Sequence, residues 1–313
     1  MKSIVSILAF AAMLSFAVGT HAQMQMSRPV QTFDTSAGPV KITPVYHASL
    51  EIEAGGKVII IDPAKPAMFM GLPQADLILI TDIHGDHLDA DMIKAESKAG
   101  TDIIAPAAVA KTVTTAKVIG NGEKTTWGAW TIEAIPMYNT TASRGPAPGK
   151  LFHDKGRGNG YVLTYGGKRF YFSGDTEGIP EMRALKNIDV AFVCMNLPYT
   201  MTPEEAADAV KAFHPKVAIP YHYKGQDTAV FKKALDGTTA DDQVLADVGE
   251  LFKRIKAGSP KDTVPPAPTD GQLEVITRQA IREHNLMAIL EQAIVDEVLR
   301  ASKSPAPVSA SAK

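Results

Sequence analysis

Residues 76–87 of this 313-residue chain read DLILITDIHGDH, an apolar run followed directly by a cluster of carboxyl and imidazole side chains. The run 76–81 is short and rich in branched apolar residues, which predicts a buried β-strand rather than a helix. In the turn after the strand, side chains two or three residues apart can converge on one point, and carboxylate and imidazole are usual ligands of Zn and similar ions. The stretch therefore predicts a metal site at a strand end, and a chance cluster of loop residues is the alternative.

The sequence on both sides of this motif predicts alternating strands and helices. Before it we expect strands at residues 41–46, 50–53 and 57–61, the last two joined by a Gly-Gly turn. After it we expect a helix at 90–99, strands at 102–104 and 127–135, a loop at 139–150, a hairpin at 160–165 and 169–172, a helix at 179–185, a strand at 190–195, a helix at 202–213 and a strand at 217–220. The helix at 202–213 has the clearest start, because Thr202 is a capping hydroxyl and Glu205 follows three residues later. Two sheets covered by helices are the simplest architecture for this order.

The two ends of the chain differ in composition from its centre. Residues 1–22 combine a basic start, an apolar stretch and small residues before Gln23, which predicts a secretory signal peptide. The apolar stretch is shorter than the roughly 20 residues of a spanning helix, although an uncleaved anchor is the alternative. A catalytic domain is expected at 38–258, a proline-rich linker at 259–271 and a helical extension at 272–302, which packs on the body or, as the alternative, contacts a second copy or a partner helix.

Composition narrows the compartment and the partners. The single cysteine, Cys194, excludes an internal disulfide. The net charge of −2 and the absence of a long Lys/Arg run argue against binding to nucleic acid or anionic lipid. We therefore expect a secreted, periplasmic protein with no stable membrane insertion after cleavage, a small-molecule substrate and the option of a homo-oligomer.

Three later positions repeat the character of the motif, each at a strand end or in a glycine-rich loop: His153, Asp175 and His222. With the motif they give the candidate metal ligands Asp82, His84, Asp86, His87, His153, Asp175 and His222. Two metal ions that share a bridging carboxylate and leave one position for water need about this many ligands. The set predicts a binuclear hydrolytic centre.

The order and context of these residues resemble the metallo-β-lactamase superfamily over most of residues 41–225. The flanking segments 47–49, 61–63 and 220–223 are similar to the branch with ascorbate-6-phosphate lactonase and the N-acyl-phosphatidylethanolamine phospholipase D enzymes. The resemblance implies an α/β fold, a four-layer αββα sandwich with metals at one edge between the sheets.

The same resemblance implies a division of the ligands. It places Asp82, His84 and His153 on a first metal and Asp86, His87 and His222 on a second, with Asp175 bridging. Asp82 departs from the family pattern, which usually has histidine there, and a carboxylate makes the site harder and more negative. Zn is expected, with Mn and Fe as alternatives.

Such a centre predicts a chemistry. A hydroxide bridging two cations can attack an acyl or phosphoryl centre, and Asp86 could orient it or accept its proton. His47 is expected near the mouth of the site, where it could hydrogen-bond substrate or a developing anion, and a purely structural histidine is the alternative. Asp62 is expected to be a buried carboxylate that holds a ligand loop.

The substrate is less specified than the reaction. Lactone, ester and phosphodiester hydrolysis all suit the centre, and a phosphate group could be met by Arg144, Lys150, Lys155 and Arg157 unless these are solvated charges. For Asn139, Tyr199, Tyr221 and Tyr223, ordinary packing is preferred over a place in the pocket. A non-catalytic metal- or ligand-binding protein and a β-lactam hydrolase are the alternative functions.

Overall fold

The computed structural model describes residues 30–236 except 66, 68 and 70. The predicted signal peptide, the proline-rich linker, the C-terminal helical extension and the last part of the predicted 38–258 domain lie outside these residues. Among the described residues, no helix has the length and apolar character needed to cross a bilayer.

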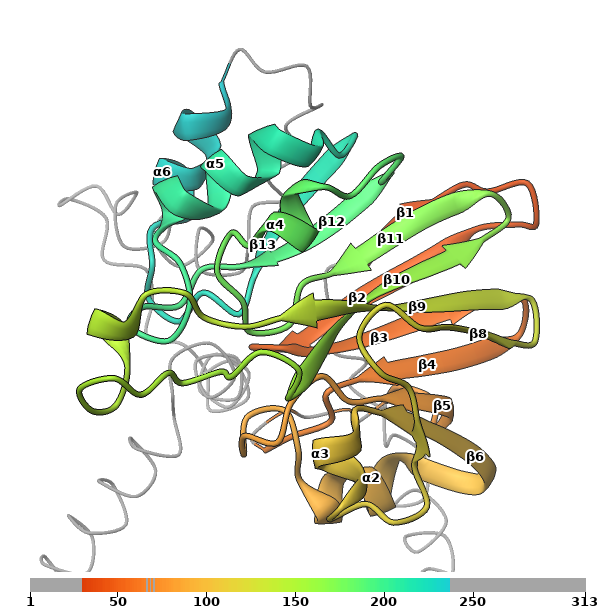
Figure 1. Cartoon of the computed structure of the whole chain (residues 1–313). Coiled ribbons are helices and arrows are strands. Elements are labelled where there is room, and N and C mark those ends of the chain that lie inside the picture. Colours follow the sequence, from red (N-terminus) through yellow and green to blue (C-terminus); the bar gives the residue numbers. More distant parts are fainter. Residues whose placement is uncertain (1–29, 66, 68, 70, 237–313) are drawn as a thin grey trace, which may run out of the picture.

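Two sheets stack face to face with helices outside them (Figure 1). The first sheet has the strand order β1-β2-β3-β4-β5-β6-β7, with the bounds Gln31–Phe33, Val40–Tyr46, Ser49–Ala54, Lys57–Ile61, Ala75–Leu79, Ser97–Ala105 and Lys117–Val118. The second has the order β13-β12-β11-β10-β9-β8, with the bounds Val217–Tyr221, Val190–Cys194, Lys168–Phe172, Gly158–Tyr165, Trp130–Met137 and Lys124–Trp127. Both sheets are antiparallel in part and parallel in part, with β4 to β7 parallel in the first and β11 to β13 parallel in the second. The predicted αββα sandwich is confirmed.

Side chains of the central strands alternate between two cores, as the two-residue period of a strand requires. In β4, Ile59 and Ile61 belong to the core between the sheets, whereas Val58 and Ile60 pack toward the helices. That outer core is closed by α2 (Ala90–Glu96) and α3 (Ala107–Ala110). The near-continuous apolar runs of these strands thus follow from burial on both faces.

The second sheet is covered by α4 (Pro180–Arg183), α5 (Pro203–Phe213) and α6 (Thr228–Leu235) (Figure 1). The predicted start of α5 is confirmed by a capping box. Thr202 Oγ1 accepts a hydrogen bond from the Glu205 amide at 3.1 Å, and Glu205 Oε2 accepts one from the Thr202 amide at 2.9 Å. These bonds satisfy amides that would otherwise be left without partners at the helix end.

Three predicted elements differ from the structure. The helix expected at 90–99 ends at Glu96, and β6 begins at once because Ser97 pairs with Ala75 of β5 and its hydroxyl donates to the Ile93 carbonyl at 2.6 Å. The strand expected at 127–135 is a hairpin of β8 and β9 that turns at Gly128, whose φ of 56° suits glycine. The helix expected at 179–185 is only the single turn α4.

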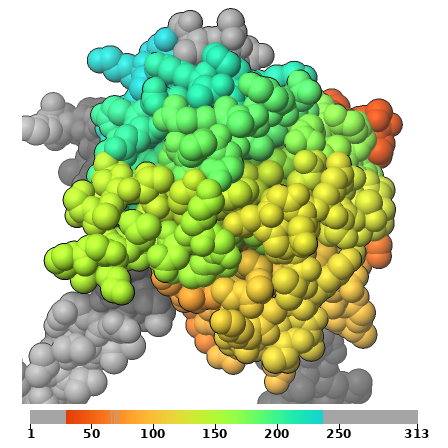
Figure 2. All heavy atoms as spheres, in the orientation of Figure 1, coloured from red at the N-terminus to blue at the C-terminus, as the bar shows by residue number. Residues whose placement is uncertain are grey.

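The candidate ligands leave the sheets at the ends of several strands. β5, β11 and β13 run into the segments that carry residues 82–87, Asp175 and His222, respectively. The loop between β9 and β10, which contains the short 3-10 helix Ala142–Arg144, carries His153. In Figure 2 this yellow-green loop stands out from one side of the surface.

Candidate metal centre

The seven predicted ligands form two adjacent clusters. The first cluster contains Asp82, His84 and His153, and the second cluster contains Asp86, His87, Asp175 and His222. Within each cluster the ligand atoms lie within 4.8 Å of one another. Their grouping matches the division expected for two metals, while their role as ligands stays a prediction.

A tight turn separates the two halves of the motif. The amides of His87 and Leu88 both donate to the His84 carbonyl, at 3.0 and 2.9 Å. This turn lets a six-residue segment supply residues to both clusters. An extended course of the same residues would have spread them over a longer distance.

Asp175 links the clusters. Its Oδ2 lies 3.2 Å from His87 Nε2 and 3.1 Å from His153 Nε2, and its Oδ1 lies 3.3 Å from His222 Nε2. Two ligands of one tetrahedral Zn lie about 3.4 Å apart, given bonds of about 2.1 Å, so these separations fit shared cations. The carboxylate occupies the place that a bridging ligand would take.

Buried atoms without partners support that fit. Among the described residues, His87 Nε2, His153 Nε2 and Asp175 Oδ1 are buried and have no hydrogen-bond partner. Such orphaned groups are rare in folded proteins and require an explanation. Burial would raise the pKa of Asp175, but the facing imidazoles of His222 and His87 hold it well below its ordinary value. An ionised carboxylate among imidazole nitrogens is a suitable donor set for a divalent cation.

Asp62 holds His87 in place. It is fully buried, and its carboxylate accepts hydrogen bonds from the Thr81 amide at 2.7 Å and the Thr81 hydroxyl at 2.6 Å. Its Oδ2 also lies 2.8 Å from His87 Nδ1, which leaves Nε2 facing the cluster. The prediction that Asp62 supports the ligand loop is confirmed by these contacts.

Asn139 supports His153 in a similar way. Its Oδ1 accepts from the His153 amide at 2.8 Å and lies 2.8 Å from His153 Nδ1, while its Nδ2 donates to the Tyr199 carbonyl at 2.8 Å. Asn139 is thus a buried structural residue, and its hydrogen bonds add a support for His153 to the ordinary packing that was expected of it. Two further supports were missed: Glu177, within 3.4 Å of the Asn139 amide, and Asn196, whose amide lies 3.3 Å from His222 Nδ1. An amide or carboxylate just beyond a strand end is the only signal that the sequence offered.

Asp82 is fully buried and paired with Arg157. Arg157 Nε donates to Oδ1 at 3.0 Å and Nη2 donates to Oδ2 at 2.8 Å. The same Oδ2 lies 3.0 Å from His84 Nδ1 and 3.9 Å from His153 Nε2. Burial alone would raise the pKa of Asp82, but the hydrogen bonds from His84 and Arg157 and the charge of Arg157 lower it to about 2.

The basic residues near His153 are mostly engaged with carboxylates. Arg144 binds Glu205 through two hydrogen bonds, and Lys155 Nζ lies 2.7 Å from Glu181. Arg157 is held by Asp82. Each of these three side chains therefore has an anionic partner, and a contact between them and a phosphate group stays a prediction.

His47 lies at the second cluster. Its Nε2 is 3.3 Å from Asp86 Oδ2, and its ring stacks on that of His222 with 3.7 Å between centroids. Burial lowers the pKa of His47, and the hydrogen bond to Asp86 offsets part of that shift. The backbone φ is 54° at His47 and 48° at His222, a left-handed conformation that is costly for non-glycine residues and common at functional sites.

The tyrosines divide between packing and exposure. The hydroxyl of the buried Tyr221 accepts from the Gly174 amide at 2.8 Å, beside Asp175, which makes it a structural support. Tyr199 is 39% exposed and packs edge-on against Phe152, with ring centroids 4.8 Å apart. Phe152 precedes His153, so this aromatic pair lies beside the first cluster.

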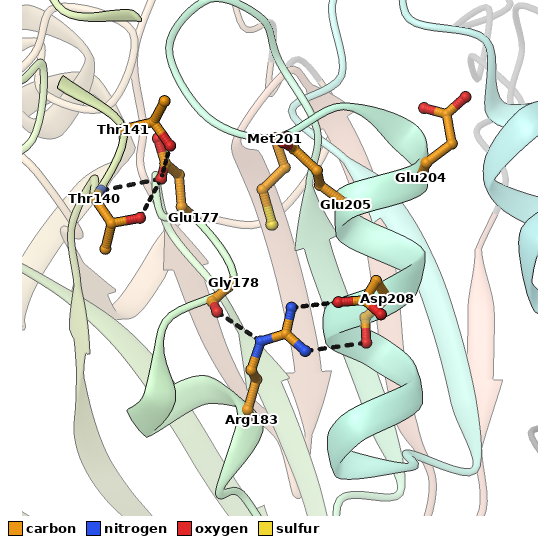
Figure 3. Close-up of a pocket in the computed structure, with 9 residues that line it drawn as sticks. All are labelled: Thr140, Thr141, Glu177, Gly178, Arg183, Met201, Glu204, Glu205 and Asp208. Atoms are coloured by element: carbon orange, nitrogen blue, oxygen red, sulfur yellow. Dashed lines mark hydrogen bonds and ion pairs between the residues drawn. The ribbon is translucent and has the colours of Figure 1, made fainter. Parts of the chain in front are cut away.

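A cavity of about 380 Å³ lies elsewhere, between the loop after β9 and the start of α5 (Figure 3). Its wall includes Thr140 and Thr141, which donate to Glu177, and Arg183, which is held by Gly178 and Asp208. None of the seven candidate ligands lines it. Its lining residue Glu177 accepts a hydrogen bond from the Asn139 side chain, which is the link between this cavity and the first cluster.

Comparisons with known proteins identify the family to which the chain is similar. Residues 41–222 match the family model described as the beta-lactamase superfamily domain. A protein of Thermococcus onnurineus named as a metal-dependent hydrolase is 32% identical over 236 residues, which cover 68% of this chain and 99% of that protein.

Solved structures show the same relationship. A Parabacteroides distasonis protein, whose structure is described as that of a metal-dependent hydrolase, is 41% identical with a TM-score of 0.66, and the match covers 70% of this chain and 98% of that one. A metallo hydrolase from Ignicoccus hospitalis shares the fold, with 24% identity, a TM-score of 0.55 and coverage of 66% of this chain and 94% of that one.

Proposed function

This chain belongs to the beta-lactamase superfamily of metal-dependent hydrolases. On that premise we propose that it uses two divalent metal ions to hydrolyse a small-molecule lactone or ester. The convergence of seven ligand side chains in two clusters joined by Asp175 carries the proposal. The buried imidazole nitrogens without partners support it, because a cation would satisfy them.

Divalent ions held there would lower the pKa of a coordinated water and polarise the electrophile. We assign to Asp86 the role of interacting with the attacking water. Its side chain is 43% exposed, and its Oδ2 lies 3.3 Å from both His47 Nε2 and His222 Nε2. The hydrogen bonds from these two histidines outweigh burial and lower the pKa of Asp86, so its carboxylate is ionised. A carboxylate with a lowered pKa is a weak proton acceptor, so these contacts support orientation of the attacking water as its main role.

His47, which lies outside the motif, restrains the Asp86 side chain. The His222 amide donates to the His47 carbonyl at 3.2 Å, so the backbones that carry these two rings are joined. The stacked rings and the shared contact with Asp86 keep the carboxylate in one position. We propose that His47 both holds Asp86 and stabilises negative charge that develops on the substrate.

The charges around the first cluster favour a neutral electrophile. Three of the four basic residues of this loop, Arg144, Lys155 and Arg157, are bound to carboxylates, and a phosphodiester would have to compete for them. Two of the exposed large apolar side chains, Ile83 in the motif and Tyr199 beside Phe152, belong to the same region. A lactone or ester with apolar substituents suits such surroundings better than a phosphate ester does.

The metal proposed is Zn, with Mn or Fe as alternatives. Four imidazoles and three carboxylates make the donor set intermediate between soft and hard. Metal analysis of the purified chain would test both the number of ions and their identity.

Hydrolysis of lactone, ester and phosphodiester panels by the metal-reconstituted chain tests the activity. Asp86→Ala should lower turnover by about 10²–10⁴-fold, the usual contribution of a positioned acid or base. Asp91→Ala, which removes an exposed aspartate that pairs with Lys65, is the matched control and should retain activity. Equal turnover in Asp86→Ala and the unmodified chain would refute the assigned role.

A further inference from the structure

The loop between β9 and β10 supplies two groups to the first cluster. One is the candidate ligand His153, and the other is the Arg157 guanidinium, four residues later, which grips Asp82. Arg157 is itself anchored, since its Nη1 donates to the Phe152 carbonyl at 2.7 Å and its amide donates to the Asp154 carbonyl at 3.2 Å. The loop therefore fixes the guanidinium and His153 relative to each other.

We propose that Arg157 is a positioning residue of the metal centre: it holds Asp82 Oδ2 toward His84 and His153 and offsets its charge. This inference rests on the proposed function, because it assigns Asp82 as a metal ligand. The two parallel hydrogen bonds fix the plane of the carboxylate, which a single contact would leave free to rotate.

The backbone on which Asp82 sits is already rigid. The preceding residue, Thr81, is held by Asp62 through its amide, and its carbonyl accepts from the Asn159 amide at 2.9 Å. The main freedom left to Asp82 is rotation of its side chain. Arg157 removes that freedom, so the carboxylate acts as a ligand of fixed direction.

The charge balance gives the pair a second consequence. A histidine ligand is neutral, whereas Asp82 adds a buried negative charge, and a buried charge without a partner is strongly destabilising. With Arg157 as counterion, the Asp82–Arg157 pair has no net charge and, electrostatically, replaces a neutral imidazole. The second cluster keeps two carboxylates, Asp86 and Asp175, without such a counterion of lysine or arginine type among the ion pairs of the described residues. The two clusters should therefore bind cations with unequal affinity, the second more tightly.

Titration of the purified metal-free chain with Co²⁺, followed by visible absorption and calorimetry, tests the inference. The unmodified chain should bind two equivalents in two resolved steps. In Arg157→Gln the loss of the two orienting hydrogen bonds should outweigh the removal of a nearby positive charge, so the weaker step should lose at least tenfold in affinity, while the tighter step stays unchanged. Arg144→Gln is the matched control, because it breaks a two-bond guanidinium–carboxylate pair in the same loop without touching the clusters, and it should bind both ions normally.

A double-mutant cycle shows whether Arg157 acts through Asp82. If it does, Arg157→Gln should cause no further loss in weak-step affinity when Asp82→Asn is already present. Additive losses would overturn the inference, as would unchanged binding of both ions by Arg157→Gln.

Should Arg157→Gln fail to fold, Arg157→Lys carries the test, because it keeps the charge but not the paired hydrogen bonds. The weak step should still lose affinity, and full retention would refute the positioning role. The proposed function fails by a different result, which is the absence of hydrolysis across the panels by the unmodified, metal-loaded chain.

Discussion

The substitution Asp62→Asn changes one atom of a buried side chain and should lower metal affinity at the second cluster. The carboxylate faces three donors: the Thr81 amide at Oδ1, and the Thr81 hydroxyl and His87 Nδ1 at Oδ2. An asparagine can keep its oxygen toward the Thr81 amide, but it then points an NH₂ group at His87. His87 would have to accept at Nδ1 and carry its proton on Nε2, the atom that faces the second cluster. The wrong tautomer cannot bind a cation there.

The magnitude follows from the bonds that change. A hydrogen bond to a charged group contributes about 1.5–3 kcal/mol and a neutral one about 0.5–1.5 kcal/mol, so the free energy of unfolding should fall by about 1–2 kcal/mol. Metal affinity at the second cluster should fall about 10–100-fold, as is usual when the partner of a ligand histidine is lost. The protein should therefore fold and still lose the tighter of its two metal-binding steps.

Competition with a chromophoric chelator measures that step, and urea unfolding of the metal-free chain measures the stability. Asp76→Asn is the matched control, since Asp76 also accepts a backbone amide, that of Val58 at 3.0 Å, but lies at the start of β5 rather than beside the clusters. Two metal-binding steps of unchanged affinity in Asp62→Asn would show that Asp62 does not set the tautomer of His87.

Two further predictions concern stability. Gly174→Ala should lower the free energy of unfolding by about 1–3 kcal/mol and displace the adjacent Asp175, because φ is 60° and the new Cβ would lie 2.5 Å from Met137 Sδ. Chemical denaturation measures this loss, with Gly149→Ala as the control, since φ there is 72° but no atom lies within 4 Å of the new Cβ. Equal losses in the two variants would exclude crowding as the cause. Asp82 should stabilise the metal-free chain by about 2 kcal/mol above pH 4, since its pKa falls from 3.8 to about 2 on folding, and this contribution should be lost as the pH drops through that range. Urea unfolding between pH 6 and pH 2 measures it, and an identical pH dependence in Asp82→Asn would contradict the assignment.

Local patterns in the sequence were sufficient for most of the fold. The continuous apolar runs of β4 and β5, the Gly-Gly turns and the Thr202 capping box each depend on neighbouring residues, and the corresponding elements were predicted from them. The errors at 90–99 and 127–135 also have a local cause. In both, a turn or a change from helix to strand occurs within one or two residues, where Ser97 and Gly128 carry only a weak signal.

The candidate site divides in the same way. Which residues could bind a metal was readable from the chain, because the ligand types are few and follow strand ends. Which residues hold them was not, since Arg157 lies 75 positions from Asp82. Asn139 and Arg157 could equally have been packing or solvated residues until the loop between β9 and β10 was placed against the motif.

The sequence by itself thus determined two sheets covered by helices and the kinds of ligand, because apolar runs, turn residues and side-chain chemistry are local properties, and the αββα sandwich was implied by the family resemblance. Only the tertiary structure decided that Asp82 is paired with the Arg157 guanidinium, that Asp62 and Asn139 orient the histidines and that Arg144, Lys155 and Arg157 are paired with carboxylates. Those choices depend on how two sheets bring distant loops together.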